Sequence, residues 1–298
     1  MKKNNKTDNL LFSEKYAKRS QLRETFHRLV KNRAALAGMI IFGVIFLGFL
    51  AGVFFIDYTM ITEGVMRDRL QKPSLTYPFG TDNMGRSLFL RVLYGARYSL
   101  ALGFGGSAVA ASLGITLGSI AGYYGGIRET LIMRFAEIMS SIPGMLLGMV
   151  IMVTLGSSLQ NLIITVGVTS IPIYIRMTRA SILQIRDQEF VEAARAIGFP
   201  NRRLILSQIL PNGMSPLIVT FSMNLGMMVM SASGLSFLGF GISPPRPEWG
   251  TLVAGGREYV RNSSHLMTFP GLFIMLTVLA FNMIGDGLRD ALDPKLKR

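Results

Sequence analysis

Residues 34–56 read AALAGMIIFGVIFLGFLAGVFFI, a run of 23 residues without a charged side chain. As an α-helix with a rise of 1.5 Å per residue, this run is about 34 Å long and can cross the hydrocarbon core of a bilayer. A cleavable signal peptide has a shorter apolar core, so we interpret the run as a retained membrane span. The stretch therefore predicts an integral membrane protein.

The rest of the chain repeats this pattern. Hydrophobic residues make up 50% of the 298 residues, charged residues make up 16%, and the mean hydropathy is +0.40. This composition is too apolar for a soluble domain with a hydrated surface. Further apolar runs lie at 99–124, 138–156, 159–175, 212–238 and 268–285. We expect an all-α polytopic membrane protein with about six transmembrane helices, although the short separation of the third and fourth runs leaves one long re-entrant hairpin as an alternative.

The apolar runs also divide the chain into regions. We expect a polar tail with an interfacial helix at 1–33, a transmembrane domain at 34–285, and a C-terminal tail at 286–298 after Gly285 and Gly287 have ended the last helix. Lys and Arg resist translocation across the membrane. With the N-terminus inside, the inside segments hold 22 Lys and Arg residues and the outside segments hold nine. Both termini and the polar segment 176–211 are therefore expected in the cytoplasm.

Small residues crowd the second apolar run. Gly114, Gly118 and Gly122 repeat every four residues, which places them on one face of a helix. Such a smooth face lets another helix approach closely. We expect this packing to lie within the chain, in preference to a dimer face between subunits.

Several classes of function are poorly supported by these residues. The basic side chains are not interleaved with exposed aromatic residues, as nucleic-acid binding would require. The chain has no cysteine, and we interpret its two histidines, His27 and His265, as solvated loop residues in preference to metal ligands. The apolar runs hold no catalytic pair and no secure acidic or histidine relay. This argues against an intramembrane enzyme and against a stand-alone channel or secondary transporter.

The polar segment contains EAARAIGFPNRRLILSQILP at residues 192–211. The residues before Gly198 follow the period of an amphipathic helix. The apolar side consists of Phe190, Val191, Ala194 and Ile197, and the polar side consists of Glu189, Glu192 and Arg195. We expect Gly198 to end this helix and Pro200 to begin another. The product is a helix-turn-helix that a membrane protein can present to a soluble partner.

Three other stretches carry distinctive motifs: GTDNMGRSLFLRVLYGARYSL at 80–100, SFLGFGISPPRPEWG at 236–250 and NMIGDGLRDALDPK at 282–295. In the first, we expect Asp82 to cap a helix or to pair with Arg86, and Arg86 and Arg91 to be free to reach water or lipid headgroups. In the second, Trp249 is expected to anchor at the bilayer interface, where its amphipathic ring is favoured.

The segment 192–211 resembles the EAA loop of ABC-importer membrane subunits. The other three stretches are similar to the C-type permease subunit of dipeptide, oligopeptide and nickel ABC importers, and the resemblance runs from about residue 30 to the end. It implies the type I ABC importer permease fold, a location in the bacterial cytoplasmic membrane, and a loop that docks into a cleft of the ATPase subunit. The ATPase-coupling residues that the resemblance implies are Glu192, Ala193, Ala194, Arg195, Gly198, Leu210 and Pro211.

The resemblance also implies the partners: a B-type sister permease, two ATPase subunits and an extracytoplasmic solute-binding protein, all working at the lipid bilayer. No segment fits G-x-x-x-x-G-K-[ST], so we expect no nucleotide site and no cofactor in this chain, with ATP and Mg bound by the ATPase subunits. The chain is thus expected to be a transport subunit and no enzyme. Peptides are the expected cargo, and nickel chelates or other small solutes are the alternative.

Overall fold

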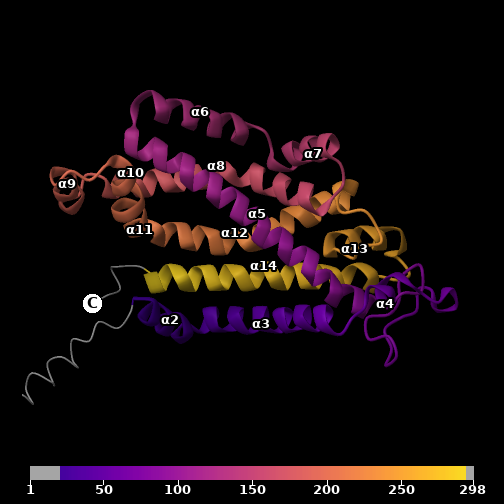
Figure 1. Cartoon of the computed structure of the whole chain (residues 1–298). Helices are drawn as coiled ribbons and strands as arrows, with labels where there is room; N and C mark the ends of the chain where they lie inside the picture. The colour runs from indigo at the N-terminus through magenta and orange to yellow at the C-terminus, as the bar shows by residue number, and fades with distance from the viewer. Residues whose placement is uncertain (1–20, 293–298) are drawn as a thin grey trace, which may run out of the picture.

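The structure, a computed structural model, describes residues 21–292, with side chains from residue 24 onward. The predicted tail before residue 21 and the last residues of the predicted C-terminal tail, 293–298, lie outside the described residues. Within the described range the chain is helical and has no named strand (Figure 1). The longer helices are α2 (Gln21–Lys31), α3 (Arg33–Phe54), α5 (Leu88–Tyr124), α6 (Gly126–Ser141), α7 (Gly144–Leu155), α8 (Leu159–Ile185), α12 (Met214–Leu235) and α14 (His265–Leu292).

The prediction of about six transmembrane helices is confirmed. Five helices are long and apolar enough to cross a membrane: α3, α5, α8, α14, and α12 with its continuation to Phe240. The bent pair of α6 and α7 makes up to six. Successive spans run in alternating directions, so that the start of α2 and the end of α14 lie at the same end of the bundle (Figure 1).

The third span differs from the prediction of one helix over 138–156. It consists of α6 and α7, which meet at an angle of 91°. The break falls at Ile142 and Pro143, which have extended ψ angles of 127°. Proline has no N–H to donate within a helix, and it also disfavours helical geometry at the residue before it. Pro143 therefore explains the break, and the sequence carried that signal.

The last helix is also longer than predicted. Gly285 and Gly287 do not end it, since α14 continues through both glycines to Leu292. A Cβ atom added at Gly285 would lie 2.5 Å from Cγ of Met223 on α12, and one added at Gly287 would meet Ala35 and Leu29. The two glycines thus permit close packing of α14 against its neighbours, and the predicted boundary at residue 286 falls inside a helix.

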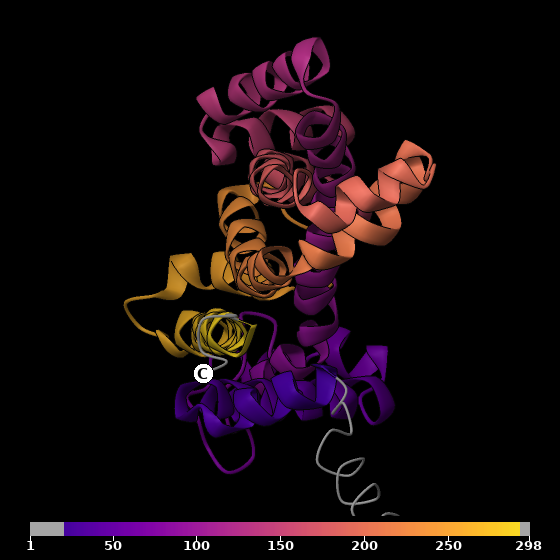
Figure 2. The ribbon, with the colours of Figure 1, turned by 90° about the vertical axis from the view of Figure 1, so that its left-hand side faces the viewer.

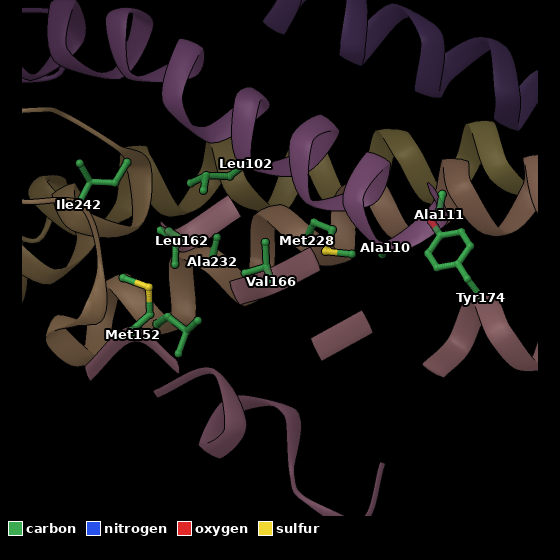
Figure 3. Packing of buried hydrophobic residues seen from close by; sticks show 11 residues of the cluster. Leu102, Ala110, Ala111, Met152, Leu162, Val166, Tyr174, Met228, Ala232 and Ile242 are labelled. Atoms are coloured by element: carbon green, nitrogen blue, oxygen red, sulfur yellow. The ribbon is translucent and has the colours of Figure 1, made fainter. Parts of the chain in front are cut away.

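An apolar cluster joins α5, α7, α8 and α12 (Figure 3). Its members include Leu102, Met152, Leu162, Tyr174 and Met228, each at most 2% exposed. The helix α14 lies beside α3 on one side and α12 on the other (Figure 1). The bundle thus has a continuous packed interior, while many large apolar side chains on its outer surface face away from it.

The glycine face of α5 packs within the chain, as expected, and its partner is α8. A Cβ atom added at Gly118 would lie 2.7 Å from the carbonyl oxygen of Ile175 and 2.7 Å from Cβ of Thr178. At Gly122 the corresponding distance to Cβ of Ile182 is 3.0 Å, and Gly114 faces Tyr174. Because the nearest atoms include backbone, any side chain here would force the two helices apart.

We predict that Gly118→Ala and Gly43→Ala change the stability of the protein in opposite directions. Alanine is favoured over glycine in a helix by up to about 1 kcal/mol, and a Cβ atom at Gly43 would meet nothing within 4 Å. Overpacking at Gly118 should instead cost about 1–3 kcal/mol. Thermal unfolding in detergent should therefore show a lower Tm for Gly118→Ala and an equal or higher Tm for Gly43→Ala. Equal stabilisation by both variants would contradict the close contact of α5 with α8.

Candidate coupling site

The polar segment 176–211 is only partly a loop, because its first residues, 176–185, complete α8. The chain then forms α9 (Glu189–Ala196), α10 (Asn201–Arg203), the π-helical turn η2 (Leu204–Ile209) and α11 (Leu210–Asn212). We call residues 189–212 the elbow. It stands at the end of the bundle where both ends of the described chain lie, and it projects away from the spans (Figures 1 and 2).

One side of α9 is buried against the bundle, as the amphipathic pattern predicted. Val191 is fully buried and Ala194 is 9% exposed. They pack in a cluster that we call the elbow base, which contains the buried residues Ile182, Val191, Ala194, Leu204 and Ile209 with Tyr123, Ile185 and Phe199 around them. The elbow base thus joins α9 and η2 to the end of α8.

The other two members of the predicted stripe stay outside this cluster. Phe190 is 39% exposed and Ile197 is 74% exposed. The two residues are separated by about two helical turns, so they share one edge of the apolar arc, and the bundle covers only the opposite edge. The bundle therefore covers only part of the predicted apolar stripe, and the elbow presents exposed apolar side chains.

Gly198 ends α9 in a conformation that suits glycine. Its φ angle is +88°, in the left-handed region. The N–H of Gly198 donates to the carbonyl oxygen of Arg195 at 3.0 Å, and the N–H of Phe199 donates to that of Ala194 at 3.2 Å. This is the Schellman pattern of helix ends, with Phe199 packed on the elbow base. A Cβ atom at Gly198 would meet nothing within 4 Å, so backbone conformation alone requires the glycine.

One hydrogen bond fastens the elbow directly, and two others hold the chain on either side of it. The Tyr123 hydroxyl of α5 donates to Oδ1 of Asn201 in the elbow at 2.7 Å. Just after the elbow, the carbonyl oxygen of Gly213 accepts from the Ser181 hydroxyl of α8 at 2.8 Å. Just before it, the Arg186 guanidinium donates to the carbonyl oxygen of Gly122 at the end of α5, at 2.9 Å. Together with the elbow base, these bonds attach the elbow to the ends of both α5 and α8.

The predicted coupling residues share this one elbow but differ in exposure. Glu192, Ala193, Arg195, Gly198 and Pro211 are exposed, Leu210 is half-buried, and Ala194 is buried. Within residues 24–292, Glu192 forms no ion pair with Arg195 or with any other residue. The sequence did not indicate the roles of Tyr123 and Asn201 or the exposure of Leu206, because these depend on how distant segments meet.

Three predictions about residues at the end of the bundle opposite the elbow are wrong: those for Trp249, His265 and Arg91. Trp249 is fully buried, and its indole N–H donates to the carbonyl oxygen of Val92 at 2.9 Å, so it does not anchor at the bilayer interface. His265 is buried at the start of α14, whereas His27 is exposed as predicted but lies in the helix α2 and not in a loop. Arg91 is 5% exposed and is not free to reach water. A hydropathy pattern cannot distinguish a polar side chain with a buried partner from a solvated one.

Asp82 pairs with Arg86, which was one of the two alternatives predicted for it from the sequence. Nε of Arg86 donates to Oδ2 of Asp82 at 2.7 Å, and Oδ1 accepts from the backbone N–H groups of Met84 at 2.8 Å and Arg86 at 3.0 Å. Arg86 is half-buried in this arrangement. Among the described residues, no group of three or more acidic or histidine side chains could hold a metal ion.

We predict that Gly198→Ala loosens the elbow and that Gly198→Asn loosens it less. A non-glycine residue in the left-handed region costs about 1–2 kcal/mol, but asparagine tolerates it. Hydrogen exchange of the amides of residues 198 and 199 should be about tenfold faster in the alanine variant, since 1.4 kcal/mol is a factor of ten. Wild-type protection in the alanine variant would show that the turn does not depend on glycine.

Comparisons with known proteins agree with the fold and with the motifs. Residues 114–298 match the family model described as binding-protein-dependent transport system inner membrane component, and residues 20–73 match the N-terminal TM domain of oligopeptide transport permease C. The chain is 42% identical to the dipeptide transport system permease protein DppC of Alkalihalophilus pseudofirmus over 95% of this chain and 93% of that protein. It is 38% identical to the glutathione transport system permease protein GsiD of Pectobacterium atrosepticum over 94% of this chain and 93% of that protein.

The fold is also similar to that of solved structures. An inward-facing structure of the MetNI methionine ABC transporter has a TM-score of 0.57, with 20% sequence identity over 68% of this chain and 97% of the other chain. At this level of identity the likeness concerns the fold alone. Taken with the family models and the relatives, it leads to one conclusion: the chain belongs to the family of inner membrane components of binding-protein-dependent transport systems.

Proposed function

We propose that this chain is a membrane-spanning subunit of an ATP-driven peptide importer and that its elbow receives the motion of a separate ATPase subunit. The exposed elbow carries the proposal, because it packs against α8 and is hydrogen-bonded to α5 yet projects beyond the spans (Figure 2). A coupling element needs both properties. It must be accessible to a soluble partner, and it must move together with the helices to which it is attached.

The exposed residues of the elbow suit such a contact. Phe190 and Ile197 offer apolar area that the chain itself leaves uncovered, and Glu192 and Arg195 offer charges without partners in the described chain. Protein interfaces commonly combine a buried apolar centre with a polar rim. Ala193, which is small and exposed, allows a partner to approach α9 closely.

The energy for transport comes from other subunits in this proposal. The 298 residues contain no G-x-x-x-x-G-K-[ST] segment, which supports a transport subunit without a nucleotide site of its own. ATP and Mg are bound by two ATPase subunits. A B-type sister permease completes the translocation path, and an extracytoplasmic solute-binding protein delivers the cargo.

The elbow lies on the cytoplasmic side of the membrane in this proposal. Basic residues favour that orientation, because the segments on the elbow side of the spans hold most of the Lys and Arg. The ends of the described chain, Gln21 and Leu292, lie at the elbow end as well (Figure 1). Both termini would then be cytoplasmic, and α4 (Tyr58–Thr62) and α13 (Trp249–Gly256) would lie at the opposite, outer face.

Short peptides are the proposed cargo. The two relatives described above are named for dipeptide and glutathione transport, and the N-terminal region matches a model named for oligopeptide transport. These names favour peptides over nickel chelates or other small solutes.

We predict that a Phe190→Ser, Ile197→Ser double variant loses its ATPase subunits. Burial of a large apolar side chain contributes about 1.5–3 kcal/mol, so removal of two partly exposed ones should weaken association at least tenfold. Co-purification of the ATPase subunits and peptide-stimulated ATPase activity in proteoliposomes measure the effect. A matched control is Val65→Ser, which alters a 58% exposed apolar residue far from the elbow and should leave both readouts unchanged. Wild-type recovery of the ATPase subunits with the double variant would refute the docking role.

A further inference from the structure

A cavity of about 560 Å³ lies at the end of the bundle opposite the elbow. It is bounded by the Asp82–Arg91 segment, by the loop from Pro244 to Arg246, and by α13. This volume falls in the range of small-molecule binding sites, which is about 300–1,000 Å³. The charged residues in its lining are Asp82, Arg86, Arg91 and Arg246.

These four residues leave the cavity with an excess of positive charge. Asp82 is the single acidic residue of the lining, and both of its carboxylate oxygens are already occupied. The carboxylate lies 2.7 Å from Nε of Arg86 and 3.4 Å from a terminal nitrogen of Arg91. Arg246 forms no ion pair with any residue in the part of the chain that the structure describes. One carboxylate therefore pairs with two guanidinium groups, and the third, that of Arg246, has no acidic partner among the described residues.

Arg91 is the residue that most needs a further partner. It is 95% buried, and the nitrogen that faces Asp82 also donates to the carbonyl oxygen of Ile61 at 3.2 Å. Its Nε is buried and has no hydrogen-bond partner. A buried guanidinium with an unused donor is costly, and negative charge held in the cavity beside it offsets that cost.

The other nearby buried acid cannot supply this anion. Glu248 is fully buried, but its carboxylate accepts from the N–H groups of Gly250 at 2.8 Å and Thr251 at 2.9 Å at the start of α13. It also accepts from the Thr251 hydroxyl at 3.1 Å. The carboxylate of Glu248 therefore caps the N-terminus of α13.

We propose that the cavity binds a small molecule that bears a carboxylate, with Arg91, Arg86 and Arg246 as its counter-charges. A planar guanidinium matches a carboxylate in geometry and can donate two parallel hydrogen bonds to it. Apolar side chains, among them Leu88, Leu252 and Leu266, line the same cavity. An occupant with carbon atoms next to its charge fits these walls better than an inorganic anion does.

The carboxyl end of a short peptide has this chemistry, and this assignment alone rests on the proposed function. In that case the cavity holds a peptide at the outer face, on the opposite side from the ATPase contact. The site itself is independent of transport, since it depends only on charge and space within this chain.

The test is equilibrium binding to the full-length chain in lipid nanodiscs, measured by titration calorimetry. The probes are alanyl-alanine, its C-terminal amide, butyrate and inorganic phosphate. We expect the dipeptide or butyrate to bind, and the amide to bind at least tenfold more weakly than the dipeptide. If butyrate binds and the dipeptide does not, the carboxylate site is supported but a peptide is not its ligand. This conclusion holds whatever the outcome of transport assays. Equal binding of the amide and the dipeptide, tighter binding of phosphate than of either carboxylate, or no binding of any probe would overturn the proposal.

Two variants locate the binding within the chain. Arg246→Gln removes an exposed charge of the lining and should weaken carboxylate binding about tenfold, the loss of one charge-assisted hydrogen bond. Arg261→Gln removes an exposed arginine that does not line the cavity and should leave the affinity unchanged. Arg246 serves better than the buried Arg91, whose replacement can unfold the protein. Equal effects of the two variants would show that general surface charge, and not this cavity, attracts the anion.

Discussion

Close packing of α5 against α8 holds the centre of the bundle together and positions the elements around it. Lipid offers no hydrophobic force that drives two spans together, so helices in a membrane associate through tight packing and hydrogen bonds. The glycines of α5 allow the backbones to approach until a Cβ atom at Gly118 would lie 2.7 Å from a carbonyl oxygen of α8. The apolar cluster of α5, α7, α8 and α12 is built around the same contact.

This contact also explains how the elbow is held. The helix α8 leads into the elbow through a short turn, and α5 ends beside it at Tyr123 and Tyr124. The elbow base packs side chains from α8, α9 and η2 together, and the Tyr123 hydroxyl bonds to Asn201. Because packed interiors transmit displacement and do not absorb it, a force on the elbow would move α5 and α8 together. In the proposed mechanism, this is how ATP-driven closure reaches the spans.

The sequence predicted those features that depend on local pattern. Long uncharged runs identified the spans, the repeat of Gly114, Gly118 and Gly122 identified a helix-packing face, and Gly198 identified the end of α9. Pro143 indicates the break in the third span, but it lies within an apolar run that was predicted to form one helix.

Features that depend on distant partners could not be predicted in this way. Arg91 and Trp249 have polar or amphipathic side chains, and both are buried because α4, α5 and α13, which are far apart in the sequence, meet at one end of the bundle. The outward position of Phe190 and Ile197 likewise depends on which edge of α9 faces the elbow base. The candidate coupling residues were located by the helix-turn-helix pattern and by the family resemblance, whereas the arginine-lined cavity came from three-dimensional packing alone.

In the proposed orientation the elbow lies on the cytoplasmic side and the arginine-lined end of the bundle faces outward. The chain contains no cysteine, so single cysteines introduced at the exposed positions Ser207, in the elbow, and Asn262, at the opposite end, report on the two sides independently. Labelling with a membrane-impermeant maleimide can be compared between right-side-out and inverted vesicles. With the elbow in the cytoplasm, Ser207→Cys should be labelled only in inverted vesicles and Asn262→Cys only in right-side-out vesicles. The reverse pattern, or labelling of both cysteines from the same side, would rule out this orientation.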